Sequence, residues 1–176
     1  MSTKVITGEV RFSYCHVFEP SAITEGQTPK YGVSIIISKK DKKTLDKINA
    51  AIEAAKQEGK AKFGGKIPNV MKLPLRDGDE ERPDDEAYAG SYFLNASSAT
   101  QPGIVDENRD EIMTKTEFYS GCYGRASLNF YAFNTAGNKG IAVGLNNLQK
   151  LRDGEPLGGV RTSAADDFAD EDDDLS

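Results

Sequence analysis

The segment FYSGCYGRASLNFYAF, residues 118–133, holds the clearest β-strand pattern of the chain. From Gly124 to Phe133 the side chains alternate in type, which is the period of a strand with one buried face. The apolar face carries small and larger hydrophobic residues, as the packed interior of a small barrel requires: Ala126, Leu128, Phe130 and Ala132. This pattern predicts a β-rich fold that is organised around this segment.

The opposite face of the same segment carries one cation, two small polar groups and two aromatic rings, but no acid: Arg125, Ser127, Asn129, Tyr131 and Phe133. Exposed rings beside a guanidinium suit a surface on which unpaired bases stack while the cation meets phosphate. Two alternatives stay open. The rings of Tyr131 and Phe133 can pack beneath the helix or a long loop, and a one-residue bulge would exchange the two faces.

Working outward from this segment, several shorter stretches also have strand character. Residues 4–18 alternate in the same way, with Val10, Phe12 and Tyr14 on one face. Further strands are expected at residues 31–38, 91–97, 104–105 and 140–148.

One helix is expected near residues 39–58, because Leu and Ile recur there at helical spacing. Ser38 is the predicted N-cap, with Asp41 bonding back to it. Residues 59–90 are rich in Pro and charge and look like a long loop. Many strands, one principal helix and long loops predict a mainly β fold, a small closed or partly open β-barrel rather than a doubly wound sheet.

Other side chains extend the predicted nucleic-acid-binding set. Tyr119 and Tyr123 precede the strand, and the glycines between them either let the backbone approach a ligand or mark a bend of the barrel. Tyr31 begins a strand beside Lys30. The long segment 59–90 is a basic loop that we expect to close over a nucleic-acid strand, and an ordinary solvated loop is the alternative for its Lys66, Lys72 and Arg76.

The charge of the chain is unevenly distributed. Its 176 residues include 22 Lys and Arg against 28 Asp and Glu, a net charge of −6. Residues 163–176, SAADDFADEDDDLS, hold seven of the acids and no base, so residues 1–162 keep 21 acids against 22 bases, a net charge of +1. We therefore expect one domain over residues 1–162 and a disordered acidic tail over residues 163–176.

The acidic tail has two interpretations. It either only keeps the protein soluble, or it docks on a basic surface, steered by its acids and fixed by one of its two apolar residues. The second interpretation gives a partner-binding set of Asp166, Asp167, Phe168, Asp170, Glu171, Asp172, Asp173, Asp174 and Leu175.

Signatures of enzymes and metal sites are not found in the sequence. Cys15, His16 and Cys122 are its only Cys and His residues, and neighbours on a strand point to opposite faces, so no metal site is expected. The acid-rich residues 76–86 lack the calcium-loop pattern and are read as a solvated loop. We find no catalytic set, cofactor site, secretory signal or apolar run of about 18 residues. Two free thiols indicate a reducing compartment, so we expect a cytoplasmic protein. Because no catalytic set is found, we also expect the protein to be non-enzymatic.

Six stretches that span most of residues 5–160 have a familiar pattern: VRFSYCHVFEP, YGVSIIISKKD, YFLNASS, QPGIVD, FYSGCYGRASLNFYAFN and GIAVGLNNLQKLRDGEPLGG. They resemble phage-encoded single-stranded-DNA-binding proteins, a family long catalogued only as a domain of unknown function. The resemblance implies an OB-fold with elaborated loops that binds single-stranded DNA and serves replication or recombination in the host cytoplasm. It also implies that the acidic tail recruits replication or recombination proteins and competes with DNA for the basic groove. Several relatives end in Phe, whereas this chain ends in Leu175 and Ser176, so Phe168 is the candidate replacement.

We predict sequence-independent binding of single-stranded DNA in replication, recombination and repair, with bases stacked on rings and phosphates paired with Lys or Arg. The alternative is a non-enzymatic protein-interaction module whose acidic tail mimics DNA. Because edge strands of a barrel can pair between chains, a homodimer is also compatible with the sequence.

Overall fold

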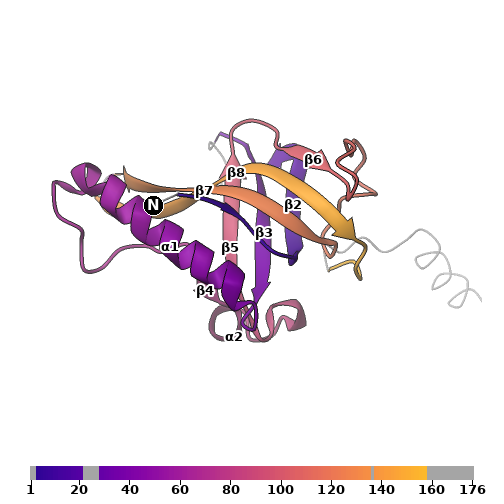
Figure 1. Ribbon diagram of the computed structural model, residues 1–176, viewed down its shortest axis with the longest axis horizontal. Helices are drawn as coiled ribbons and strands as arrows, with labels where there is room; N and C mark the ends of the chain where they lie inside the picture. The colour runs from indigo at the N-terminus through magenta and orange to yellow at the C-terminus, as the bar shows by residue number, and fades with distance from the viewer. Residues whose placement is uncertain (1–2, 22–27, 136, 158–176) are drawn as a thin grey trace, which may run out of the picture.

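The computed structural model describes residues 3–21, 28–135 and 137–157 (Figure 1). The predicted acidic tail lies outside these described residues. Along the chain the elements are β1 (Lys4–Ile6), β2 (Val10–Ser21), β3 (Lys30–Ser38), α1 (Lys42–Glu58), η1 (Lys60–Phe63), β4 (Arg76–Asp77), α2 (Gly78–Glu81), η2 (Glu86–Tyr88), β5 (Ser91–Ser98), β6 (Gly103–Val105), β7 (Tyr123–Thr135) and β8 (Asn138–Arg152). None of the helices among the described residues is long and apolar enough to cross a membrane.

Five strands close into a barrel. β2 pairs with β3, β3 with β5, β5 with β8, β8 with β7, and β7 again with β2. The β5–β8 pairing is parallel and the other four are antiparallel. The short strands β1 and β6 extend the sheet beside β7 and β8, and β4 pairs with β5. The mainly β fold with one principal helix is therefore confirmed.

The alternation predicted for β7 is present in the structure. Its apolar face is buried in the barrel core, with Ala126, Leu128, Phe130 and Ala132 each no more than 4% exposed. Burial of such side chains contributes about 1.5–3 kcal/mol for each larger one, which fixes the register of the strand. The observed strand begins at Tyr123 and not at Phe118 as predicted, and it continues to Thr135. Residues 118–122 form a turn instead, in which the Phe118 ring packs on Phe12 with 5.0 Å between centroids.

Helix α1 packs across β7 and β1 (Figure 1), and its buried residues join the core of the barrel. The predicted cap is wrong in detail. The Asp41 side chain accepts a hydrogen bond from the Thr44 backbone N–H, so Asp41 is the N-cap, while the Ser38 hydroxyl accepts from the Lys40 N–H instead. The helix therefore begins three residues after the predicted start, at Lys42. It ends at Gly59, where a Cβ would lie 2.1 Å from that of Ala132.

Strand β2 departs from simple alternation at Tyr14. Between the pairs Ser13–Ser34 and His16–Gly32, two residues of β2 lie opposite one residue of β3, which is a β-bulge. At the bulge Tyr14 has a φ of 48° and its side chain is 53% exposed. The prediction that Tyr14 lies on the same face as the core residue Phe12 is therefore wrong, because the extra residue turns the ring outward.

Candidate nucleic-acid interface

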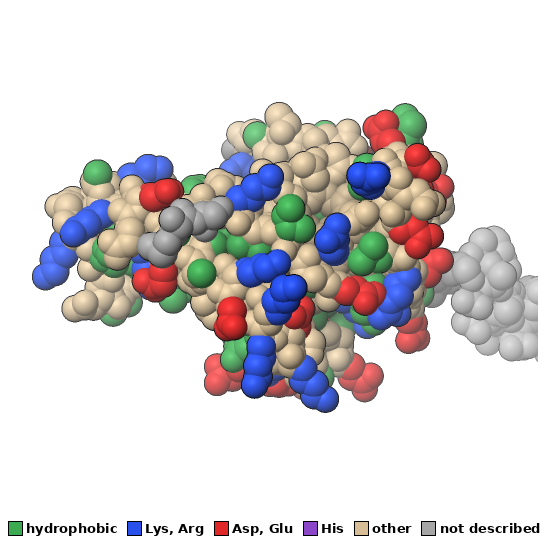
Figure 2. Space-filling model, viewed as in Figure 1, with side chains coloured by type: hydrophobic (Ala, Val, Ile, Leu, Met, Phe, Trp, Pro, Cys, Tyr) green, Lys and Arg blue, Asp and Glu red, His purple; other side chains and the backbone are tan. Residues whose placement is uncertain are grey.

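The outward face of β7 carries the residues that the sequence singled out first. Arg125 is exposed and Tyr131 is 41% exposed, whereas Asn129 and Phe133 are half-buried. The Arg125 Nε donates to Gln149 Oε1 at 3.1 Å, and Asn129 Oδ1 accepts from the Thr3 hydroxyl at 3.1 Å. Figure 2 shows this side of the molecule, where basic side chains are scattered over the middle and many acidic ones gather along the right and lower margins.

Tyr119 and Tyr123 are engaged with the chain that follows β8. The Tyr123 ring contacts the guanidinium groups of Arg11 and Arg152, whose Cζ atoms are 5.2 and 3.8 Å from its centroid. The Tyr119 hydroxyl lies 2.9 Å from a carboxylate oxygen of Asp153, and burial raises the pKa of this phenol. Both rings therefore hold the end of the barrel sheet in place, as well as being candidates for stacking.

The predicted basic residues of the long loop are not brought together with these rings in one site. Lys66, Lys72 and Arg76 are all exposed. The backbone of Lys72 bridges to β8, with its carbonyl accepting from the Ile141 N–H at 2.9 Å. Arg76 lies 3.7 Å from a carboxylate oxygen of Glu81. The structure thus distributes the predicted set over β7, the end of β8 and the 59–90 segment.

A groove of about 770 Å³ lies over the outward faces of β2, β3 and β5. Strands β7 and β8 cross in front of β3 and β5 in Figure 1, so the groove and the outward face of β7 lie on different sides of the barrel. Of the predicted residues, the groove contains Tyr31. Its full lining is Tyr14, His16, Ser21, Thr28, Lys30, Tyr31, Gly32, Val33, Ser34, Arg82, Asn95, Ala96 and Ser97.

The groove has the composition of a binding site for an anionic, ring-bearing ligand. Its described lining residues include two cations, Lys30 and Arg82, and no Asp or Glu. Tyr14, His16 and Tyr31 supply rings, and much of the remaining lining is small. A groove that carries both rings and cations suits single-stranded nucleic acid, because the bases can stack on the rings while the cations neutralise the phosphates between nucleotides.

Tyr14 occupies the groove at a conformational cost. A positive φ is uncommon for a bulky aromatic residue and typically costs about 1–2 kcal/mol, so the surrounding sheet must enforce it. Burial raises the pKa of the neighbouring Cys15 thiol to about 12, so this cysteine stays a neutral group that packs against the core. Strained residues gather at functional sites, and this one presents an exposed ring to the groove.

Arg82 is the second unusual residue of the groove. Its guanidinium carbon lies 5.4, 5.0 and 5.1 Å from the ring centroids of Tyr14, Tyr88 and Phe93. The Tyr88 hydroxyl is in turn 3.0 Å from that of Ser34. The side chain is half-buried, yet within the part of the chain that the structure describes no oxygen acceptor is hydrogen-bonded to this guanidinium. The rings hold the cation in position, and its N–H donors remain available for an anion.

Sequence reasoning missed Tyr14, His16 and Arg82 as site residues. Arg82 sits among acids in the sequence RDGDEERPDDE, which was interpreted as a solvated loop. No binding role was assigned to His16, but it is exposed and lines the groove. The described residues contain no cluster of three His, Cys, Asp or Glu side chains that is able to hold a metal ion.

Comparisons with known proteins identify relatives of the chain. A family model described as the ssDNA-binding protein of Enterobacter phage Enc34 matches residues 3–176. Protein p50 of Acyrthosiphon pisum secondary endosymbiont phage 1 is 30% identical over 177 residues, which cover 95% of this chain and 93% of p50.

Solved structures agree with these matches. The single-stranded DNA-binding protein from bacteriophage Enc34 in complex with ssDNA is similar with a TM-score of 0.78 at 26% identity, over 89% of this chain and 90% of that one. gp2.5, a single-stranded DNA binding protein of bacteriophage T7, is similar in fold with a TM-score of 0.60 at 14% identity, over 92% of this chain and 99% of that one.

Proposed function

The chain belongs to the family of phage single-stranded-DNA-binding proteins represented by that of Enterobacter phage Enc34, and we propose that it binds single-stranded DNA in the groove over β2, β3 and β5. The observation that carries this proposal is Arg82. A half-buried guanidinium that rests on three rings without a hydrogen-bonded acceptor among the described residues is a site prepared for an anion. Among the residues that the structure describes, the lining of the groove beside it includes no Asp or Glu that would repel a phosphate.

Binding in the groove combines stacking with charge neutralisation. Tyr14, His16 and Tyr31 offer ring faces, and each base stacked on such a ring contributes about 1–3 kcal/mol. Arg82 and Lys30 neutralise phosphates, which makes the affinity fall as salt rises. Stacking accepts any base, so the proposed binding is independent of sequence.

The predicted residues on β7 extend this track around the barrel. Gly144 of β8 is paired on one side with Ser97 of the groove and on the other with Asn129 of β7. Tyr131 lies beside the same glycine, 3.7 Å from where a Cβ would stand. A DNA strand that leaves the groove past Ser97 would therefore cross the sheet at Gly144, where no side chain stands in its way, and reach Tyr131. Arg125 and Phe133 lie on the same face of β7.

We propose that the acidic tail competes with DNA for this groove. The described chain ends at Leu157, which packs beside Ile36, Tyr88 and Phe93, two of which are the rings under Arg82. The first tail acid, Asp166, follows nine residues later, a reach of about 30 Å when extended. Seven acids tethered at this distance would bind the cations of the groove until DNA displaces them. The tail released in this way then recruits replication or recombination proteins through Phe168 or Leu175.

The same proposal assigns the protein to phage DNA replication, recombination and repair in the host cytoplasm, without a catalytic step. A homodimer through the edge strands remains part of it. The protein-interaction module with a DNA-mimicking tail is the alternative, and it predicts that residues 1–162 alone do not bind DNA.

Titration of a fluorescent oligo-dT with the full chain tests the proposed function. We expect wild-type protein to bind and Arg82→Ala to bind more weakly, with a salt slope reduced by about 0.7 because one phosphate contact is lost. Lys56→Ala is the matched control, since this lysine lies on α1 and pairs with Glu53. Equal affinities and slopes for Arg82→Ala and Lys56→Ala would contradict the assignment of the groove, and absence of binding by wild-type protein would contradict the function itself.

A further inference from the structure

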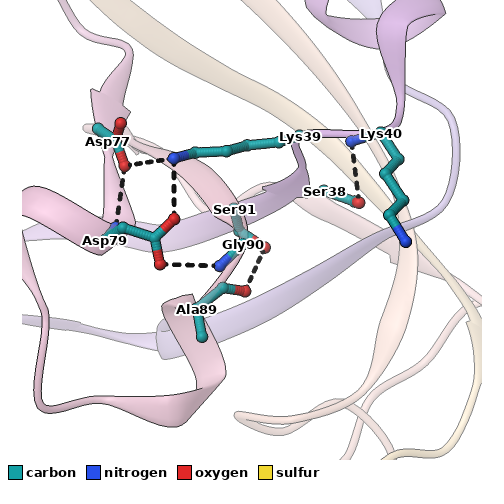
Figure 3. Close-up of polar contacts among 8 residues, drawn as sticks. All are labelled: Ser38, Lys39, Lys40, Asp77, Asp79, Ala89, Gly90 and Ser91. Carbon is teal, nitrogen blue, oxygen red and sulfur yellow. Dashed lines mark hydrogen bonds and ion pairs between the residues drawn. The ribbon is translucent and has the colours of Figure 1, made fainter.

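A single ammonium group joins two carboxylates beside the segment that carries Arg82. The Lys39 Nζ lies 2.8 Å from Asp77 Oδ1 and 2.8 Å from Asp79 Oδ2, as Figure 3 shows. Lys39 directly follows β3, whereas the two acids lie at the start of α2. We call these three residues the Lys39 clamp. The pKa of each carboxyl is lowered mainly by its hydrogen bond from Lys39, so both are ionised at neutral pH.

The clamp is reinforced by backbone hydrogen bonds at both ends of the segment 77–90. Asp77 Oδ1 accepts from the Asp79 N–H at 2.9 Å, which caps α2. Asp79 Oδ1 accepts from the Gly90 N–H at 3.0 Å (Figure 3). The Gly90 carbonyl in turn accepts from the Lys39 backbone N–H at 3.0 Å. The start and the end of the segment are thus fixed to the same point after β3.

Arg82 stands at the end of the turn that the clamp holds. Its N–H donates to the Gly78 carbonyl at 2.9 Å, and its carbonyl accepts from the Asp85 N–H at 3.1 Å. Gly78 is buried so closely that a Cβ there would lie 2.4 Å from the Tyr88 carbonyl oxygen. Displacement of α2 would therefore move Arg82 relative to the rings of Tyr88 and Phe93.

We propose that Lys39 is a positioning residue for the DNA groove: its two ion pairs hold α2, and through α2 they keep the Arg82 guanidinium on its rings with its donors directed to the strand. This inference rests on the proposed function of the groove. Lys39 is not part of the groove lining, so it acts through Arg82 and not on DNA itself. Exposed ion pairs contribute little to global stability, and loss of the clamp is expected to misplace Arg82 without unfolding the barrel.

Lys40 provides a matched control. It carries the same charge one residue later, but its side chain points away from the two carboxylates (Figure 3). Lys39→Met and Lys40→Met therefore lower the net charge equally, and only the first breaks the clamp. Methionine also keeps an unbranched apolar side chain near the Tyr92 ring, whose centroid lies 5.2 Å from the Lys39 Nζ.

A double-mutant cycle with oligo-dT tests the proposal. We expect Lys39→Met to weaken binding by about 3- to 10-fold, Lys40→Met by less than about 2-fold, and Lys39→Arg to restore most of the loss. In the Arg82→Ala background, Lys39→Met is expected to have no further effect. A loss of equal size in that background would overturn the proposal, because it would show that Lys39 or the two unmasked acids act on DNA directly.

A second measurement follows Arg82 without DNA. Three nearby rings shift the NMR resonance of the Arg82 Nε–H, and we expect Lys39→Met, but not Lys40→Met, to move it toward the position of a free arginine. If Lys39→Met changes neither the Arg82 resonance nor the affinity for oligo-dT, the positioning role is overturned. The proposed function still stands in that case, provided that the wild-type protein binds oligo-dT. If wild-type protein does not bind oligo-dT, the proposed function fails, and the role of Lys39 in DNA binding fails with it.

Discussion

Replacement of Tyr14 by glycine separates what the ring does for DNA from what the residue does for the fold. Tyr14 has a φ of 48° at the β2 bulge, a conformation that glycine adopts without strain. Relief of the strain is worth about 1–2 kcal/mol. The extra chain entropy of glycine, about 0.5–1 kcal/mol, and loss of the contact with the Arg82 guanidinium, about 0.5–1 kcal/mol, oppose it. The free energy of unfolding is therefore expected to change by less than about 1 kcal/mol.

DNA binding by Tyr14→Gly is expected to change far more. Removal of one stacked ring costs about 1–3 kcal/mol, which is about a 5- to 150-fold loss of affinity. Urea unfolding and oligo-dT anisotropy measure the two quantities on the same preparation. Tyr14→Phe is the control, because it keeps the ring and is expected to bind within about 2-fold of wild type.

Two outcomes would refute this reasoning about Tyr14. Unchanged affinity in a folded Tyr14→Gly protein would show that the exposed ring does not stack on DNA. A large loss of unfolding free energy would show that the aromatic side chain itself holds the bulge, contrary to its exposure.

Two further predictions concern the tail and β7. Deletion of residues 164–176 is expected to tighten oligo-dT binding at low salt, with a difference that shrinks as salt screens the tail; equal or weaker binding after truncation would exclude competition. Tyr131→Ala is expected to weaken binding by about 1–3 kcal/mol with little loss of stability, since the ring is 41% exposed, and a large drop in the unfolding midpoint would instead assign the ring to the fold.

The fold was predictable because most of its strands follow the simple period-two rule. The buried face of β7, the helical spacing of α1 and the turn residues between strands are local signals, and together they indicate a β-rich fold with one helix. The start of α1 was misjudged because Ser38 and Asp41 are both acceptable caps, and only the path of the chain after β3 decides between them.

The groove was less predictable, because its residues depend on tertiary structure. The β-bulge in β2 moves the Tyr14 ring to the other face of the strand, but no residue type in the sequence predicts that bulge. Tyr14 was therefore expected on the same face as the core residue Phe12. Arg82 looked like one charge among many acids, and only folding places it on rings from β2, η2 and β5. Tyr31 was predicted because it begins a clear strand, and it lines the groove. Its contact with DNA stays a prediction, as does that of Tyr131 and its neighbours on β7.

Chemical-shift mapping of the full chain with oligo-dT tests the central claim most directly. If the groove holds the strand, the amides of Tyr14, Gly32 and Asn95 and the side-chain N–H of Arg82 shift on titration, in proportion to the bound fraction. If these signals stay in place while shifts are confined to Arg125 and Tyr131 on β7, the strand lies on the other side of the barrel and the account given for the groove is wrong.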